Sequence, residues 1–413
     1  MSTDAHIERH SGELLRFLRE IVGVATVNPP GGHYDAITRR LVAELESTGL
    51  AARRFAIPKA LMQQSLPPEQ QGYPRYNVLG KWRVPGARKT LHFNAHYDVV
   101  PVSGRWRHGG PFSGKVAGGW IYGRGTADMK GSIASLILAL KALRATGSAP
   151  KLNVEVSFTA DEETDSLLGT GWLVRNAPIR PDYAIVMEGG EGNAICCGHN
   201  GVVWLEVAVH GRAAHGSLPE LGVNALEKMS CLVLALGNYK KKLARTTFVT
   251  PEGKTLRATI NVGGVFDCGQ GAKVNTVPAY ASFTIDRRVL PLESHAAAER
   301  DLRAFLADAA RRIPQCRISV RKISENFACF HTPKGPFYSA MASSVRRGRR
   351  APTVFSTSTG FNDMHFFANE LKIPTVGYGP VGKDIHAVDE RASVRELIST
   401  AKIYADLLTS FAG

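Results

Sequence analysis

TLHFNAHYD, residues 90–98, begins as an apolar segment typical of a buried strand and ends in His96 and Asp98. Working outward, the alternation in LNVEVSFT (152–159) and the apolar YAIVM (183–187) predict two further strands, and a buried helix is predicted over 129–146. Strands that alternate with helices indicate an α/β fold, here with a mixed, largely parallel sheet.

The pattern changes near residue 202 and changes back near residue 324. Half-exposed strands and two amphipathic helices are predicted between these points, at 202–210, 223–238, 256–264, 279–288, 293–312 and 317–321. A chain of 413 residues exceeds what one core usually carries. We therefore expect a first domain made of 1–201 and 324–413, with an α+β domain of ferredoxin-like type inserted at 202–323.

Composition narrows the class of protein. The formal net charge is +15, which would draw a small anionic substrate towards the molecule. The basic residues are scattered, and the one dense cluster, 346–350, has no aromatic residues between its arginines, so we expect no nucleic-acid partner.

The sequence has no run of 18 apolar residues, so we expect no membrane span. The polar N-terminus and six spread cysteines without a CxxC spacing favour a cytoplasmic protein with reduced thiols.

Acidic and histidine residues gather where the predicted strands end, the edge at which open α/β sheets bind ligands. Singly, each has an ordinary explanation: a structural histidine, a helix cap at Asp128, or a solvated acidic turn. Together, buried carboxylates would repel one another unless cations neutralised them. Imidazoles mixed with carboxylates suit zinc, cobalt or manganese. The residues concerned are His96, Asp98, Asp128, Glu162, Glu163, Glu188 and His386.

Seven motifs resemble, in order and spacing, those of the M20 metallopeptidases, and nearest the succinyl-diaminopimelate desuccinylase and acetylornithine deacetylase branches. They are FNAHYDVVP, GRGTADMKGSIAS, TADEE, VMEGG, AAHGSLPELGVNAL, NTVP with DRRVLP, and GPVGKDIHAVDE, and they extend over nearly the whole chain.

The resemblance implies two divalent metal ions per subunit, with zinc expected first and cobalt or manganese as alternatives. Asp128 would bridge the ions, His96 and Glu188 would complete one ligand set, and Glu163 and His386 the other. Asp98 would fix the tautomer of His96, and Glu162 would be the general base. The peptide bond Asp128–Met129 is expected to be cis.

The inserted domain is implied to be a dimerisation or lid domain, so a homodimer or a higher homo-oligomer is expected. His215 would polarise the scissile carbonyl in the neighbouring subunit's site. Arg288 would bind a substrate carboxylate. Asn275 and the backbone amide of Gly360 would contact the substrate.

The leading hypothesis is hydrolysis of the amide bond of an N-acyl amino acid. Three alternatives stay open: a dipeptidase or carboxypeptidase, C–N hydrolysis of another anionic substrate such as an aromatic amino-carboxylate, and a non-catalytic binding protein. The chain departs from the family pattern after Glu163, at 199–201 and at Lys383-Asp384, which weakens the transfer of any one substrate.

Overall fold

A computed structural model describes residues 1–190, 192–269 and 272–413 of the chain. They form two compact units. The first comprises Met1–Cys197, His331–Ser356 and Asn362–Gly413, and the second comprises Gly198–Phe330 and Thr357–Phe361. In the described ranges, no helix is both long enough and apolar enough to cross a bilayer.

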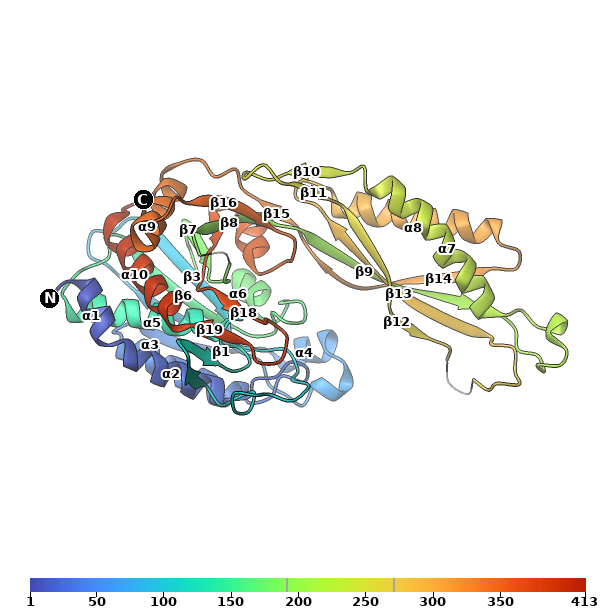
Figure 1. The fold of residues 1–413 in the computed structure, drawn as a ribbon, viewed down its shortest axis with the longest axis horizontal. Coiled ribbons are helices and arrows are strands. Elements are labelled where there is room, and N and C mark those ends of the chain that lie inside the picture. The colour runs from blue at the N-terminus through green and yellow to red at the C-terminus, as the bar shows by residue number, and fades with distance from the viewer. Residues whose placement is uncertain (191, 270–271) are drawn as a thin grey trace. The chain divides into compact units, whose positions relative to one another are not determined.

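A mixed sheet forms the centre of the first unit (Figure 1). Its strand order is β1-β2-β6-β3-β7-β17-β8-β15, with β16 paired to β8. The neighbours β6, β3, β7 and β17 are parallel, and the flanking pairs β1–β2, β2–β6, β17–β8 and β8–β15 are antiparallel. The predicted fold class is confirmed. The strands are β1 Ala51–Ala56, β2 Tyr76–Trp82, β3 Thr90–His96, β6 Asn153–Thr159, β7 Tyr183–Val186, β8 Ala194–His199, β15 Cys329–Phe330, β16 Val354–Ser358 and β17 Thr375–Gly377.

Helix α5, Lys130–Ala145, lies at the centre of the core of this unit. It is rich in Leu and Ala, which favour helix, and nearly every side chain is buried, as expected for a helix that is apolar all round. The other helices are α1 Thr3–Arg9, α2 Ser11–Gly23, α3 Tyr34–Ser47, α4 Lys59–Ser65, α6 Thr170–Asn176, α9 Pro336–Arg349 and α10 Val394–Ser410, with short turns η1 Pro68–Gln70 and η3 Phe366–Glu370.

A small antiparallel sheet of order β18-β19-β5-β4 completes the first unit. Its strands are β4 Lys115–Ala117, β5 Trp120–Tyr122, β18 Gly382–Lys383 and β19 Arg391–Ser393. It joins the segment before Asp128 to the segment that contains His386, because β5 pairs with β19.

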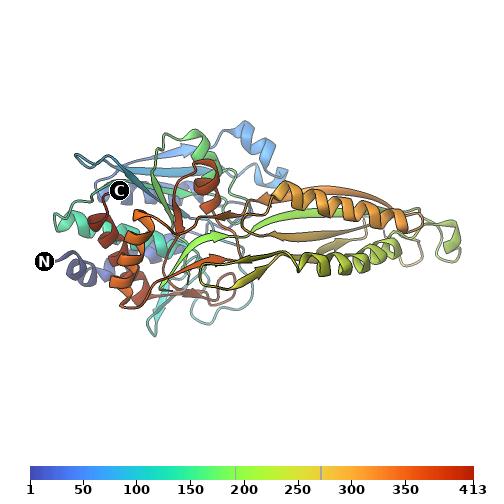
Figure 2. The same cartoon turned by 90° about the horizontal axis from the view of Figure 1, so that it is seen from above.

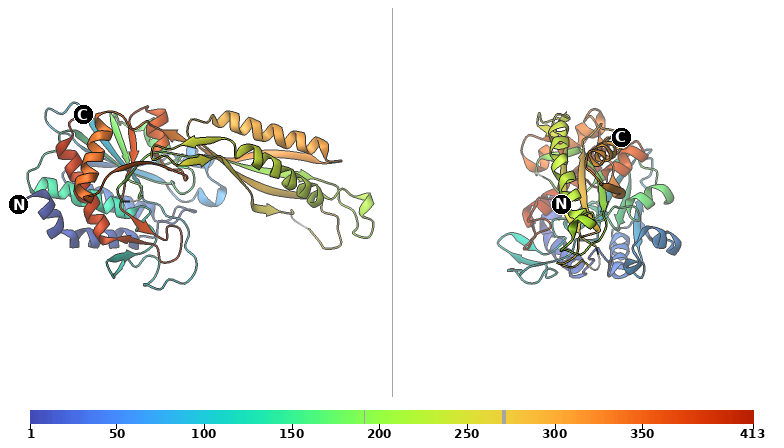
Figure 3. Two further views of the ribbon diagram at one scale, coloured as in Figure 1. Left: turned by 45° about the horizontal axis from the view of Figure 1, so that its top comes forward. Right: turned by 90° about the vertical axis from the view of Figure 1, so that its right-hand side faces the viewer.

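The second unit has the ferredoxin-like topology that the sequence predicts. Its elements are β9 Gly201–His210, η2 Pro219–Leu221, α7 Ala225–Leu243, the hairpin β10 Thr247–Val249 and β11 Thr255–Arg257, β12 Thr259–Asp267, β13 Tyr280–Val289, α8 His295–Arg312 and β14 Arg317–Asn326. The sheet order is β12-β13-β9-β14, all antiparallel. Figures 2 and 3 show α7 and α8 beside the strands, and both helices share one apolar core with the sheet.

Local predictions fail at two places near the N-terminus. The apolar positions at helical spacing in residues 7–20 predict one helix. The structure has two, because the chain breaks at His10, which caps the end of α1 and the start of α2. The polar composition of residues 60–75 predicts a surface loop. The structure instead places most of α4 there, and its Met62 is buried with Ile57 and Leu168. The stretch ends at Arg75, which is fully buried.

Candidate active site

Four parallel strands deliver polar side chains to one edge of the central sheet. His96 ends β3, Glu162 and Glu163 follow β6, and Glu188 follows β7. His386 follows β17 by way of β18. Since the carboxyl ends of parallel strands meet at one edge, these residues converge, and Asp128 joins them from the turn before α5.

Asp128 lies between the two histidines. Its Oδ1 is 3.0 Å from Nε2 of His96, and its Oδ2 is 3.1 Å from Nε2 of His386. Glu188 approaches His96, with Oε1 3.5 Å from Nε2. Glu163 approaches His386, with Oε2 3.2 Å from Nε2. The structure thus brings together all five predicted ligands, as two donor groups that share Asp128.

Two glycines allow the segment before His386 to lie directly against the other loops. A Cβ on Gly379 would lie 2.3 Å from the carbonyl oxygen of Met187, next to Glu188. A Cβ on Gly382 would lie 2.2 Å from the Cβ of Ala127, next to Asp128. A side chain at either position would push the ligand loops apart. The peptide bond Asp128–Met129 is cis, as expected.

Burial and mutual repulsion raise the pKa values of three glutamates in this cluster. Burial raises the pKa of Glu162 well above its ordinary value, against the opposing charge of His96. Burial and the charge of Asp128 raise the pKa of Glu163 to about 7 and also raise that of Glu188. Hydrogen bonds to Asp128 and Glu163 raise the pKa of His386 to about 10. The site therefore favours positive charge among its carboxylates.

The donor set fits divalent metal ions. Each group offers one imidazole nitrogen and carboxylate oxygens, a mixture that such ions bind in proteins. Donor atoms of His96, Asp128 and Glu163 lie within 4.8 Å of one another, and so do those of His96, Glu162 and Glu188. Oε1 of Glu163 is buried and has no hydrogen-bond partner among the described residues, as expected of an atom that accepts an ion.

Asp98 lies beside His96, but its carboxylate is not the closest acceptor. Nδ1 of His96 is 3.0 Å from the backbone carbonyl oxygen of Asp98 and 3.5 Å from its Oδ1. The carboxylate instead accepts the backbone N–H groups of Glu162 and Glu163, both at 3.2 Å. Asp98 therefore links the histidine to both glutamates, in addition to its expected effect on the tautomer.

Several buried residues that support the site are not among the candidate residues predicted from the sequence. Asn28 donates from Nδ2 to Asp98 at 3.0 Å and to Asp161 at 3.1 Å. Asp161 also forms an ion pair with Arg75 at 2.9 Å. Burial raises the pKa of Asp363, which accepts a hydrogen bond from Thr170, to about 6. They come from distant segments, so spacing along the chain does not group them.

Four predicted residues lie in the second unit. His215 is exposed, and its Nδ1 lies 2.7 Å from Ser217 Oγ. Its segment pairs with the segment of Asn275. His215 forms a β-bridge with Thr276, and the backbone N–H of Gly216 donates to the carbonyl oxygen of Asn275. Arg288 is partly exposed and forms an ion pair with Asp286 at 2.9 Å. The amide of Gly360 donates to Ser358 Oγ at 3.1 Å.

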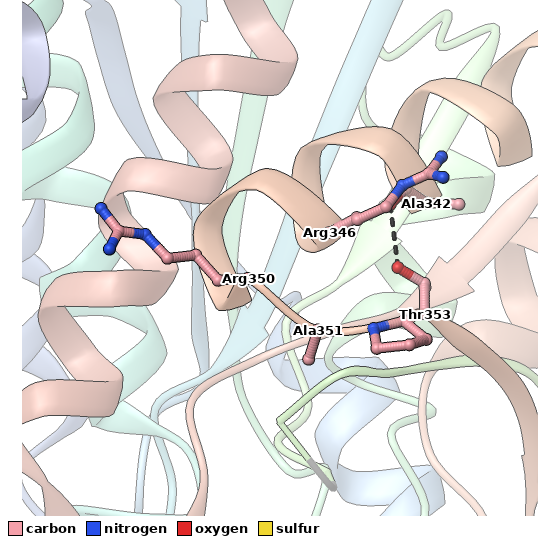
Figure 4. Close-up of a pocket in the computed structure, with 6 residues that line it drawn as sticks. Ala342, Arg346, Arg350, Ala351 and Thr353 are labelled. Atoms are coloured by element: carbon pink, nitrogen blue, oxygen red, sulfur yellow. Dashed lines mark hydrogen bonds between the residues drawn. The ribbon is translucent and has the colours of Figure 1, made fainter.

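The arginine cluster at 346–350 is divided among separate contacts. Arg347 forms an ion pair with Asp406, and Arg349 with Glu396. Arg346 and Arg350 line a surface pocket of about 550 Å³ with Ala342, Ala351, Pro352 and Thr353. Figure 4 shows the two side chains pointing away from each other, so the pocket does not focus positive charge on one ligand.

Known proteins are similar to this chain in sequence or in fold. The peptidase family M20/M25/M40 matches residues 92–410. The succinyl-diaminopimelate desuccinylase of Paracoccus denitrificans (strain Pd 1222) is 31% identical over 354 residues, which cover 83% of this chain and 88% of that protein. Among solved structures, the M20 family metallo-carboxypeptidase Sso-CP2 from Sulfolobus solfataricus has a TM-score of 0.77 at 22% identity and covers 96% of this chain and 98% of its own. Human carnosine dipeptidase 1 has a TM-score of 0.75 at 17% identity and covers 98% of each chain.

The match to the family extends over most of the chain and contains all five residues that make up the two donor groups. On this evidence the protein belongs to peptidase family M20/M25/M40 and is a metal-dependent hydrolase of C–N bonds.

Proposed function

We propose that the protein removes the acyl group from an N-acyl amino acid by hydrolysis of its amide bond. The observation that supports this best is the pair of donor groups that share Asp128, with Glu162 beside them at 3.9 Å from His96 Nε2. The 31% identity to a desuccinylase supports the acyl substrate.

The site would hold two divalent ions, for which zinc is expected and cobalt or manganese are alternatives. His96 and Glu188 would hold one ion, His386 and Glu163 the other, and Asp128 would be shared by both. When bound, they would lower the pKa of a water molecule and polarise the amide carbonyl. Glu162 is the general base: it takes a proton from water and returns it to the leaving amine. Its raised pKa, caused by burial, suits a group that must hold this proton in transit.

The second unit contributes substrate recognition in this proposal. Arg288 exchanges its ion pair with Asp286 for the substrate carboxylate, a planar group that a guanidinium binds with two hydrogen bonds. His215 acts from the partner subunit of a homodimer on the developing oxyanion, and Asn275 and the amide of Gly360 orient the substrate. We place the enzyme in the cytoplasm, in keeping with six cysteines that are spread along the chain without a CxxC spacing.

A second candidate is a dipeptidase or carboxypeptidase. The similarity to Sso-CP2 and carnosine dipeptidase 1 shows a shared fold at 22% and 17% identity, and the same site chemistry would cleave a peptide bond. C–N hydrolysis of an aromatic amino-carboxylate is a third candidate, kept open by the departures from the family pattern after Glu163, at 199–201 and at Lys383-Asp384.

A substrate panel with metal depletion tests the proposal. The chelated protein should be inactive, and added zinc, cobalt or manganese should restore cleavage of N-succinyl or N-acetyl amino acids in preference to dipeptides and aromatic amino-carboxylates. Product amine is measured for each substrate. Preferential cleavage of dipeptides would select the second candidate, and activity that survives chelation without metal would overturn the mechanism.

Replacement of Glu162 tests the base. Glu162→Gln should lower kcat by roughly 10²- to 10⁴-fold, because a carboxamide cannot take the proton, while metal content stays unchanged. Asp165→Asn is the matched control, since Asp165 lies in the same loop and its carboxylate accepts the backbone N–H of Leu167, a bond outside the cluster of predicted ligands. Equal kcat values for the two variants would remove Glu162 from the mechanism.

A further inference from the structure

Glu390 is a buried carboxylate that the proposed mechanism does not use. It is 0% exposed. Its Oε1 accepts the backbone N–H groups of Gly125 at 2.9 Å, Ala127 at 3.0 Å and Asp128 at 3.3 Å. Its Oε2 accepts from Nη1 of Arg124, also buried, at 2.5 Å. One side chain therefore holds the backbone of the turn that presents Asp128.

The same glutamate lies four residues after His386, in the segment between β18 and β19. The backbone carbonyl of Glu390 accepts the N–H of Gly123 at 2.9 Å. The close approach of Gly382 to Ala127 brings the same two segments together at a second point. Glu390 is thus a crosslink between the turn of Asp128 and the segment of His386, two side chains whose Oδ2 and Nε2 are 3.1 Å apart.

Glu390 needs an acceptor oxygen for the three backbone N–H groups and a second one for the guanidinium of Arg124, and a carboxylate supplies both. A carboxamide at position 390 would have one oxygen and one NH₂ group. If its oxygen faced the three backbone N–H groups, its NH₂ would face the guanidinium of Arg124, and the reverse orientation would place NH₂ against the N–H groups. A buried donor left without an acceptor is destabilising, so either orientation of the carboxamide would disturb the junction.

We propose that Glu390 is a positioning residue for metal binding: it sets the distance between Asp128 and His386, and so the affinity of the ion that these two side chains would share with Glu163. The inference rests on the proposed two-metal function. Supporting partners of metal ligands typically contribute about 10- to 100-fold to metal affinity.

Titration of metal-stripped protein with Co²⁺ tests this, with calorimetry for stoichiometry and affinity and with the visible spectrum of bound Co²⁺ for ligand geometry. In Glu390→Gln, one of the two sites should bind about 10- to 100-fold more weakly, with a changed spectrum for that site. The other site also contains Asp128 and should lose less affinity, because its remaining ligands, His96 and Glu188, do not lie on the segments that Glu390 joins. Glu390→Ala should show at least the same loss.

Asp389→Asn is the matched control. Asp389 is also buried and lies in the same segment with φ 61°, a conformation that Asn tolerates. Its carboxylate accepts the backbone N–H and the Nε–H of Arg107, both at 2.8 Å, whereas the N–H groups of the Asp128 turn bond to Glu390. Its two Co²⁺ affinities should equal those of the wild type.

The outcomes separate the two proposals. Wild-type protein that binds fewer than two Co²⁺ ions would overturn the two-metal function, and this inference with it. Wild-type protein that binds two ions, with Glu390→Gln unchanged or weakened equally at both sites, would overturn the inference alone. If Glu390→Ala fails to fold, Glu390→Gln, which keeps the shape of the side chain, decides.

Discussion

Asp161 immediately precedes the two glutamates of the site, and its backbone φ is 60°. Asp adopts this left-handed conformation more readily than most residues. Its carboxylate accepts hydrogen bonds from Tyr34 Oη, Asn28 Nδ2 and Arg75 Nε, all at about 3 Å. Its carbonyl accepts the amides of residues 164–166. This one residue therefore anchors the turn that presents Glu162 and Glu163.

Removal of Arg75 should leave the charge of Asp161 buried without its counterion. Arg75→Met should lower the free energy of unfolding by about 3–5 kcal/mol, as when one partner of a buried pair is lost. The double variant Arg75→Met with Asp161→Asn should recover part of that loss, because no buried charge remains. Urea unfolding measures both. Arg39→Met is the control, since its ion pair with Asp35 is exposed and should leave the midpoint unchanged. A midpoint for Arg75→Met equal to that of the control would contradict the argument.

At this scale the sequence indicates candidate metal ligands better than the residues that support them. His96, Glu163 and Glu188 are predicted as ligands because each follows a predicted strand, where open sheets bind ligands. Arg75 lies in a polar stretch that reads as a surface loop, and its partner Asp161 is 86 residues away. Nothing in local alternation or spacing marks such a residue as buried, so only the folded chain reveals it.

Elements with a clear period are the ones that the sequence predicts well. Strands β3, β6 and β13 and helices α5 and α8 fall within a few residues of the predicted ranges. Strands β1 and β8, and the short strands β4, β5, β18 and β19, are missed. Strands of two to six residues show too few alternations to be recognised, and their pairing partners decide that they form. The small sheet that joins the Asp128 and His386 segments is therefore the least predictable part of the site's framework.

The segment that contains His386 packs against the Asp128 turn at Gly382, and this contact has no room for a methyl group. In Gly382→Ala the new Cβ would lie 2.2 Å from the Cβ of Ala127, so the segment must move. We expect a fall in kcat of about tenfold or more, since small misplacements of reacting groups are costly, together with weaker Co²⁺ binding. Gly12→Ala in α2 is the control, because no atom lies within 4 Å of its Cβ position. Gly382→Ala with wild-type kcat and metal affinity would show that the two segments do not position each other.

The chain as a whole is positively charged, but its candidate metal site is rich in carboxylates. The chain as a whole has a formal net charge of +15, whereas four carboxylates, Asp128, Glu162, Glu163 and Glu188, lie around His96. Two bound divalent cations would offset the charge of these four carboxylates, so the site would not repel an anionic substrate drawn in by the positive charge of the chain. The proposed carboxylate substrate is consistent with this charge distribution.

The proposed homodimer predicts that two inactive variants restore activity when they are mixed. Glu162→Gln lacks the base and His215→Ala lacks the group offered to the neighbouring subunit, so each homodimer should be inactive. A hybrid dimer has one site with both an intact Glu162 and an intact His215. Random reassociation makes about half of the dimers hybrid, with one complete site each, so about a quarter of wild-type activity should return. Activity is measured after subunit exchange, which differently tagged chains verify. A mixture of Glu162→Gln with the double variant Glu162→Gln/His215→Ala is the control, because no combination of its chains completes a site. If exchange is complete and activity does not return, His215 acts within its own subunit or has no part in the reaction.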